Sequence, residues 1–584
     1  MLKHSLIISL LLLGLAGSTL GWLLPIPSYK TVVLLSGSLL IFYISNLIYF
    51  KSRDLKHISP TPLSIIFILF LSWSASGYLY STDPEKSLYM TIQSLSAILL
   101  YLGLTLYIDK EIQIKNILKI LLCFGAMLAL LGVLQQFPLT LFKNPIQNTV
   151  NNSTSLFVHK NIFSGYLVFL LPLSCLTFLY TFSRPWKFIS GITFVLFLIA
   201  LAFTGSRGGQ LVGIFSLFII TGYLIFKNDR KTIKILVIGI LISIVLYLII
   251  DPISKKLHES VFISSRASLV DLTEPSKWMG QQWANRILFW QGGWEIFKDH
   301  WLIGSGPNSF ELLFPKYYLN FNPVIENQVL TSGAPPHAHN LFVQTASDSG
   351  IIGIGLMLAF LAIFYMHAYK LFRSSSLDTR RTVFFLVLSI TCFLVHNMIE
   401  YNWYGPIFIC HFTFFIFAID FIYRQKFKLK KVNHRNRGVL NSSLIGVLVV
   451  FLTLLSTIQY YKFNNYLYEK FSSETNLKKL TLLVGSAKKN CPRCDRPHMK
   501  MALNLFERYK INSDEKFLDL AKEELLQGQK LNPYNPEYKG YLAQIYSVKE
   551  DHIRALSLLK EAMRFDRTHY IRILDLGGGF PQKK

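Results

Sequence analysis

Charged residues are scarce in this chain, because Lys, Arg, Asp and Glu together make up only 16% of its 584 residues. A soluble protein of this size carries roughly a quarter charged residues. The deficit is uneven, since long apolar runs fill the first three quarters of the chain and the remainder has a soluble composition. This distribution excludes a single soluble domain and indicates a membrane protein with an appended soluble domain.

Acidic residues and cysteines are also few. The chain has 33 Asp and Glu against 59 Lys and Arg, which gives a net charge of +26. In a soluble chain this excess would suggest nucleic-acid binding, but here the basic residues lie in loops between apolar runs, so we predict no nucleic-acid partner. Of the six cysteines, only Cys491 and Cys494 have paired spacing. Outside the cytoplasm this CxxC pair favours a local disulfide over a zinc or redox site.

Apolar runs long enough to cross a bilayer, which requires about 20 residues per helix, recur over residues 1–461. We therefore predict an all-α fold, a polytopic membrane helical bundle of about 12–13 transmembrane helices. The first run could instead be a signal peptide, but its length favours a helix. The candidate spans are 5–24, 31–50, 62–80, 87–107, 117–138, 162–182, 187–203, 208–226, 232–250, 350–371, 382–400, 405–423 and 439–461.

Lys and Arg are concentrated in every second loop of this arrangement. Cytoplasmic loops carry an excess of positive charge, so the N-terminus is predicted to be cytoplasmic. The loop 138–161, the large loop 251–349 and the tail 462–584 are then extracytoplasmic. The basic cluster 424–437 is suited to contact with anionic membrane lipid.

The tail 462–584 is predicted to form a separate extracytoplasmic α-helical domain. Two segments, Leu531–Pro533 and Phe565–Arg567, occupy matching places about 34 residues apart, and small residues lie where two helices must approach closely. The pattern resembles a tetratricopeptide repeat (TPR) array. Such arrays usually bind proteins, so a protein partner is expected, with a purely structural cap as the alternative.

Ionisable residues are almost absent from the middle of the spans, where a transporter would use them. Asp420 lies one helical turn before Arg424, and an i,i+4 salt bridge explains it. Polar residues collect instead in the external segments. This distribution favours chemistry at the outer membrane surface over transport.

The first external feature is the turn Thr204–Gly209, in which Arg207 is the only charge between two closely spaced spans. These spans, 187–203 and 208–226, are predicted to form a tight helical hairpin. A guanidinium makes bidentate, charge-assisted hydrogen bonds to phosphate, so Arg207 is a candidate phosphate ligand. The alternative is an arginine that extends to the lipid headgroups.

The second feature is a helical stripe that includes Arg286 and Trp290, at the depth where a lipid diphosphate would lie. The alternative is an interfacial helix with a belt of tryptophans. The third feature is the segment His337-Ala-His339-Asn340 before the next span. An imidazole is the usual general base near neutral pH, whereas a surface histidine is the alternative. Two histidines alone do not make a metal site, so we expect no metal and no cofactor.

Together these segments resemble the O-antigen ligase and O-antigen polymerase family over roughly residues 60–420. The resemblance is carried, in the family's order, by Ser81–Leu88, His159–Asn161 with Gly165–Leu167, Thr204–Gly209, Arg286 with Trp290, Gly304–Phe310, and His339-Asn340 before Gly350–Gly353. Each motif is weak alone, and the ordered set is fairly specific. Members with TPR tails also occur.

The resemblance implies a glycosyltransferase of the bacterial cytoplasmic (inner) membrane that is inverting and metal-independent. Its donor would be a glycan on undecaprenyl diphosphate, and its acceptor lipid A core or another glycan. Arg207 and Arg286 would bind the diphosphate, and His339 would accept the proton of the acceptor hydroxyl. Asn340, Asn161, Trp290 and His337 would bind or orient substrate. His396 and Glu400 would line the acceptor cavity or pair with each other.

Three alternatives remain open. An O-antigen or exopolysaccharide polymerase would join one lipid-linked repeat to another, and a protein O-oligosaccharyltransferase would modify a protein acceptor. From a different class, a lipid-linked glycan transporter would explain the spans, but it would leave the external arginines and histidine without a role.

Overall fold

The computed structural model describes residues 33, 36–44, 60–137, 153–157, 159–180, 183–258, 281–318, 335–427, 437–471 and 474–563. Within these ranges the chain is α-helical and contains no β-strand. Eleven of the described helices are long and apolar enough to cross a membrane. The predicted all-α polytopic membrane bundle is therefore confirmed.

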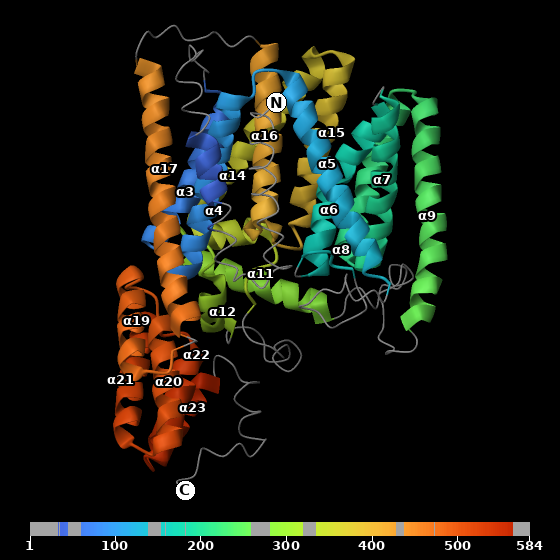
Figure 1. Cartoon of the computed structure of the whole chain (residues 1–584). Helices are drawn as coiled ribbons and strands as arrows, with labels where there is room; N and C mark the ends of the chain where they lie inside the picture. The colour runs from blue at the N-terminus through green and yellow to red at the C-terminus, as the bar shows by residue number, and fades with distance from the viewer. Residues whose placement is uncertain are drawn as a thin grey trace. The chain divides into compact units, whose positions relative to one another are not determined.

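The spanning helices correspond to the predicted spans from 62–80 onward (Figure 1). The predicted span 5–24 and half of 31–50 lie outside the described residues. The helices are α3 (Pro62–Ser76, continued by the 3-10 turn η1, Gly77–Leu79), α4 (Pro84–Tyr107), α5 (Glu111–Leu134), α6 (Lys160–Tyr180), α7 (Arg184–Thr204), α8 (Arg207–Phe226), α9 (Arg230–His258), α14 (Leu341–Ser374), α15 (Leu377–His396), α16 (Pro406–Lys426) and α17 (Arg437–Asn464).

The chain divides into two compact units. Unit 1 comprises residues 1–71, 96–278 and 356–450, and unit 2 comprises residues 72–95, 279–355 and 451–584. Helices α3, α4, α14 and α17 contribute residues to both. The predicted domain boundary at residue 461 stays a prediction.

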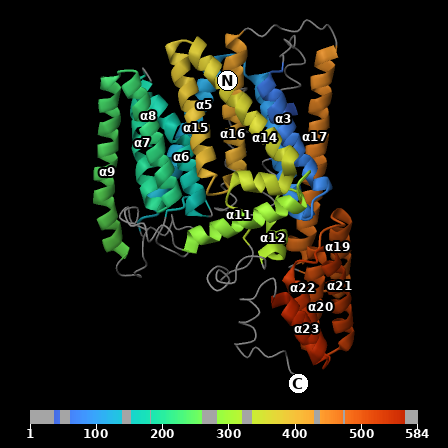
Figure 2. The ribbon, with the colours of Figure 1, turned by 180° about the vertical axis from the view of Figure 1, so that it is seen from behind.

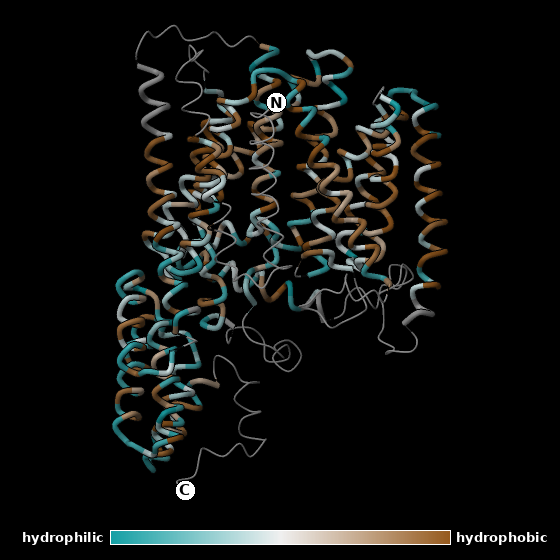
Figure 3. Tube along the Cα trace, in the orientation of Figure 1, coloured by the Kyte–Doolittle hydropathy of each residue, from teal (hydrophilic) through white to brown (hydrophobic). Residues whose placement is uncertain are grey.

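In unit 1, helices α6 to α9 are neighbours (Figures 1 and 2). Most residues of α6 are buried. Along α9, by contrast, Ile238, Leu241 and Leu248 are exposed, and the helix is hydrophobic over most of its length (Figure 3). An exposed apolar surface of this kind is stable in lipid and costly in water. Helix α9 is therefore suited to contact the bilayer.

Unit 1 also contains one buried charge pair at the end of α16. Arg424 donates a hydrogen bond to the carboxylate of Asp420, which is fully buried. The hydroxyls of Tyr101 and Thr61 donate to the same carboxylate. The predicted i,i+4 salt bridge is confirmed, and the two hydroxyls satisfy further lone pairs of the buried carboxylate.

In unit 2, helix α11 (Gln281–Asp299) packs on the short helix α12 (Phe310–Tyr318) through a cluster of aromatic residues. Phe289 meets Phe314 edge-on, with ring centroids 5.7 Å apart. Both helices lie within the predicted external loop 251–349.

The end of unit 2 is formed by a π-helical turn, η5 (Asn465–Lys470), and five amphipathic helices with their own core. The helices are α19 (Leu477–Asn490), α20 (Arg496–Asn512), α21 (Glu515–Leu531), α22 (Pro536–Val548) and α23 (His552–Met563). Cys491 and Cys494 are joined by a disulfide, as predicted. The segment Leu531–Pro533 separates α21 from α22, whereas Phe565–Arg567 lies outside the described residues, so the TPR assignment stays a prediction.

Helix α14 begins nine residues before the predicted span at 350–371. Asn340 starts it, because its side-chain oxygen accepts hydrogen bonds from the backbone N–H groups of Phe342 and Val343. Gly350 interrupts the helix with φ 64° and ψ −165°. The predicted span begins at this glycine because the residues before it are polar, and a helix cap was not anticipated there.

Candidate functional site

The turn between α7 and α8 in unit 1 presents Arg207. Gly205, with φ 58°, ends α7 in the left-handed conformation that glycine adopts readily. The hydroxyl of Ser206 accepts a hydrogen bond from the N–H of Gly209 and caps α8. Arg207 is the first residue of α8 and is half-buried. The predicted helical hairpin is confirmed.

The beginning of α6 contributes polar side chains to the same region of unit 1. The ammonium of Lys160 donates to the carbonyl of Gly205 at 3.3 Å, which joins α6 to the turn. The side-chain amide of Asn161 donates to the carboxylate of Glu400 at 2.9 Å. Asn161 therefore orients Glu400, a residue predicted to line the acceptor cavity or to pair with His396.

His396 is buried at the end of α15 and has a hydrogen-bonding partner at each ring nitrogen. Its Nδ1 lies 3.0 Å from the amide nitrogen of Asn402, and its Nε2 lies 3.3 Å from the hydroxyl of Ser164. Because Ser164 donates its own proton to the carbonyl of Asn161, the hydroxyl accepts from Nε2–H. With the amide of Asn402 donating to Nδ1, this arrangement corresponds to the tautomer that carries its proton on Nε2.

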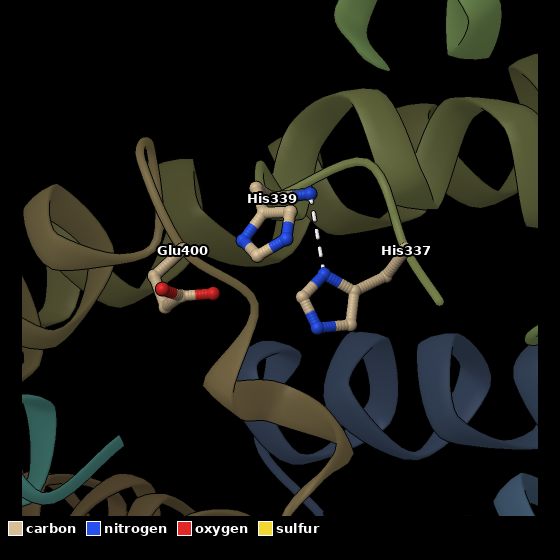
Figure 4. A group of neighbouring side chains, drawn as sticks. All are labelled: His337, His339 and Glu400. Atoms are coloured by element: carbon tan, nitrogen blue, oxygen red, sulfur yellow. Dashed lines mark hydrogen bonds between the residues drawn. The ribbon is translucent and has the colours of Figure 1, made fainter. Parts of the chain in front are cut away.

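The histidine loop, which we define as residues 335–340, precedes α14 in unit 2. His337 and His339 are both half-buried, and the backbone N–H of His339 donates to Nδ1 of His337 at 3.3 Å (Figure 4). The imidazole of His339 stacks on the ring of Phe289 at 5.6 Å. His339 has φ 50°, which is unusual for a residue with a side chain. Glu400, also drawn in Figure 4, belongs to unit 1.

Helix α11 presents Arg286 and its tryptophans. Arg286 is half-buried, and Trp283 contacts Trp290 edge-on at 5.9 Å. The indole N–H of Trp290 is buried without a hydrogen-bond partner among the described residues. Trp294 is 55% exposed and stacks on Phe297 at 5.2 Å. The predicted stripe thus contains one buried polar N–H and one exposed aromatic ring.

The glycine loop, residues 304–309, packs against the backbone of α14. A Cβ on Gly304, which has φ 83°, would lie 2.3 Å from the carbonyl of Asp348. A Cβ on Gly306, with φ 98°, would lie 2.4 Å from the side chain of Ser81. Only glycine permits both the backbone conformation and this close approach. The motif Gly304–Phe310 therefore has a structural cause in this chain.

The segment 78–87 connects the glycine loop to the C-terminal helices within unit 2. Thr82 N–H donates to the carbonyl of Ser305 at 3.0 Å, and the hydroxyl of Ser87 donates to the carbonyl of Pro307. On its other side, Arg496 forms a salt bridge with Glu85 at 3.1 Å.

Two groups in this segment, both outside the spans, are shifted by burial. Burial, together with a smaller contribution from the negative charge of Asp348, raises the pKa of Tyr80 to about 12. Burial also raises the pKa of Asp83, although the charges of Lys86 and Arg496 oppose the shift. Asp83 caps α4, because its carboxylate accepts from the N–H of Lys86 at 3.2 Å. The pair Asp83-Pro84 thus starts a helix, with proline at a position where it is well tolerated.

The predicted site residues fall in two groups. Arg207 and Asn161 belong to unit 1, and the others belong to unit 2, where the structure brings His337 and His339 together. Sequence analysis missed Gln344 and Asp348, which are buried behind the histidine loop. Their signal was present: with Asn340 they form a polar stripe at four-residue spacing just before the predicted span 350–371.

A comparison with known families gives one match, in which residues 192–358 match the family profile described as O-antigen ligase. The matched segment contains Arg207, Arg286 and His339, whereas Asn161 lies outside it. This match covers less than half of the chain and supports a membrane glycosyltransferase of the O-antigen ligase or polymerase type. No curated protein matches the chain.

Proposed function

We propose that this protein transfers a glycan from undecaprenyl diphosphate to an acceptor outside the cytoplasmic membrane. The main support is that the O-antigen ligase match spans the three residues to which chemistry is assigned, Arg207, Arg286 and His339. Such a reaction requires an activated donor, and outside the cytoplasm a lipid-linked diphosphate can supply the activation.

In the proposed reaction, an acceptor hydroxyl attacks the anomeric carbon of the donor sugar. The bond between that carbon and the bridging phosphate oxygen breaks, and its electron pair stays on the diphosphate. Arg207 and Arg286 stabilise the negative charge that develops there. The imidazole of His339 accepts the hydroxyl proton. Because the acceptor attacks from the face opposite the leaving group, the anomeric configuration inverts.

The surroundings of His339 are compatible with this role. The ring is half-buried and stacks on Phe289, which restricts its orientation while leaving part of it accessible. On α11, Trp283 and Trp290 offer aromatic faces to a sugar or a prenyl chain. Asn161, Asn340 and His337 act in this proposal by orienting substrate or the residues that bind it.

The acceptor is proposed to be lipid A core or another glycan. The proposal also includes a cytoplasmic N-terminus and an extracytoplasmic C-terminal domain, 462–584, which binds a protein partner through its TPR-like helices. The amphipathic helices α20 and α21 support a compact soluble domain of this kind.

The test compares cells that carry the wild-type gene with cells that carry Arg207→Ala, Arg286→Ala or His339→Ala. Each variant should insert into the membrane but lose at least about 100-fold in glycan transfer. Loss of attachment with intact lipid-linked polymer indicates a ligase, and accumulation of single repeats indicates a polymerase. Full transfer by His339→Ala would remove the general base from the proposal.

A further inference from the structure

The polar stripe on α14 consists of Asn340, Gln344 and Asp348, one helical turn apart. The side chains of Gln344 and Asp348 are deeply buried, at 0% and 4% exposure. Burial of an amide and a carboxylate is costly unless their hydrogen bonds are made. The partners of these two side chains therefore indicate what they do.

Each polar atom named here has a defined partner. The carbonyl oxygen of Gln344 accepts from the backbone N–H of Ala338 at 2.7 Å. Its NH₂ group donates to Oδ1 of Asp348 at 2.9 Å. Oδ2 of Asp348 accepts from the backbone N–H of Asn308 at 3.0 Å. The side chains of Gln344 and Asp348, which we call the polar pair, thus connect the histidine loop to the glycine loop.

The direction of each of these hydrogen bonds follows from which atoms can donate and which can only accept. Ala338 N–H requires an acceptor, so the amide oxygen of Gln344 must point toward the histidine loop. Its NH₂ group must then point toward Asp348, which accepts from both sides. Every donor and acceptor in the chain of bonds is matched in this arrangement only.

The histidine loop needs such support because its backbone is strained. His339 adopts φ 50°, which costs of order 1 kcal/mol or more for a residue with a side chain and persists only where its surroundings stabilise it. Gln344 binds the residue before His339, and Asn340, the residue after it, caps α14. The backbone on both sides of His339 is therefore fixed by α14.

We propose that Gln344 and Asp348 are positioning residues that set the orientation of the His339 imidazole. The role of His339 in transfer rests on the proposed function, whereas the effect of Gln344 and Asp348 on the orientation of His339 does not. A misplacement of about 1 Å at a reacting group can cost about 100-fold in rate. Disruption of the polar pair should therefore lower kcat more than it changes KM for the donor.

A charge swap tests the direction of the bonds. Gln344→Glu places two carboxylates against each other and removes the donor between them. Asp348→Asn leaves one donor facing another, either at Asn308 or at Gln344. The double variant Gln344→Glu/Asp348→Asn restores every bond, because the new amide donates to the new carboxylate and both backbone N–H groups keep acceptors.

Two readouts are measured on the full-length protein in detergent or liposomes. The first is kcat for glycan transfer, which should fall at least about tenfold in each single variant and return to within about threefold of wild type in the double variant. The second is the rate at which diethyl pyrocarbonate modifies His339, followed by mass spectrometry. This rate should change in the single variants and return to the wild-type value in the double variant.

The controls repeat the same substitutions outside the polar pair. Gln113→Glu and Asp378→Asn lie at the N-terminal ends of α5 and α15 and should leave both readouts unchanged. If a single variant does not reach the membrane, Gln344→Asn replaces it, because its shorter side chain keeps the amide but cannot span both partners.

The two possible failures are distinguishable. Full transfer by His339→Ala would contradict the proposed function. The rates at which His339 is modified in the Gln344 and Asp348 variants would still show whether these residues orient its imidazole. Wild-type modification rates in both single variants, or a double variant no better than the worse single variant, would overturn the positioning role even if His339 is essential for transfer.

Discussion

The turn that contains Arg207 and the loop that contains His339 have similar backbone conformations, but different contacts stabilise them. Both contain a left-handed residue next to the start of a helix, Gly205 in one case and His339 itself in the other. The α7–α8 turn is stabilised largely by its own neighbours in sequence, since Ser206 bonds Gly209 and Thr204 bonds Ser206, and Lys160 of α6 adds a hydrogen bond to the carbonyl of Gly205. The histidine loop depends on partners from other parts of unit 2.

This difference predicts which substitutions should disturb each region. A turn held largely by its own residues tolerates most changes elsewhere, so substitutions within it or at Lys160 should matter most. The histidine loop is supported by Gln344, which depends on Asp348, which in turn bonds the glycine loop. Substitutions far from His339 in sequence should therefore disturb it. Four predictions, from the largest expected effect to the smallest, test this contrast.

The largest effect is expected for Gly304→Ala. Its Cβ would lie 2.3 Å from the backbone of Asp348, and the residue has φ 83°. Strain and backbone displacement together should lower the free energy of unfolding by more than about 3 kcal/mol and abolish transfer. Thermal melting in detergent measures the first effect. The control is Gly355→Ala, which meets no atom within 4 Å and should be neutral or stabilising; equal melting of the two variants would contradict the backbone contact.

A smaller effect is expected for Arg496→Ala in the C-terminal helices. This change removes the salt bridge to Glu85 and leaves that mostly buried carboxylate without its cation. Because the arginine is 44% exposed, the expected loss is only about 1–2 kcal/mol. The melting temperature and the transfer rate should both fall. Arg554→Ala, at an exposed position on α23, is the matched control, and an equal loss there would show that the segment 78–87 does not depend on Arg496.

A still smaller effect is expected for Gly205→Ala in the α7–α8 turn. Alanine at φ 58° costs about 1 kcal/mol, which thermal melting can detect. The rate at which diethyl pyrocarbonate modifies His339 should stay at the wild-type value, because the histidine loop has separate supports. Gly222→Ala on α8, with no atom within 4 Å, is the control. A change in His339 reactivity would show that the two regions are not independent.

The smallest effect concerns acid stability beside the aromatic cluster of unit 2. Hydrogen bonds from Lys316 and Tyr317 lower the pKa of Asp299 below its ordinary value of 3.8. The folded state therefore favours the carboxylate, and its contribution is present above about pH 4 and is lost as the pH falls through the lower folded value. When the pH is lowered from about 5 to about 3, the melting temperature of the wild type should fall slightly more than that of Asp299→Asn. Parallel curves would contradict this assignment.

Much of the fold could be predicted from sequence because bilayer crossing imposes a simple rule on length and polarity. Runs of about 20 apolar residues identified the eleven described spans. The α7–α8 hairpin and the Asp420–Arg424 salt bridge followed from spacing alone, and the Cys491–Cys494 disulfide followed from spacing together with the predicted extracytoplasmic location of the tail. In each case the interacting residues are close in sequence, so local geometry determines the contact.

The polar residues behind the histidine loop could not be assigned in this way. Gln344 and Asp348 lie in the polar stretch before the predicted span 350–371, and spacing alone does not reveal that one faces Ala338 and the other Asn308. The early start of α14 was missed for the same reason, because the cap at Asn340 precedes polar residues that resemble a loop.

The sequence by itself determined a helical membrane protein, its spans and the residues that carry the family resemblance, because hydrophobic length and short-range spacing are properties of the chain alone. Only the tertiary structure decided how His339 is oriented and which buried side chains stabilise that orientation. The physical reason is that the chain of directional hydrogen bonds runs from Ala338 through Gln344 and Asp348 to Asn308, which lies 40 positions before Asp348, and a donor's partner at that distance is fixed by packing in three dimensions.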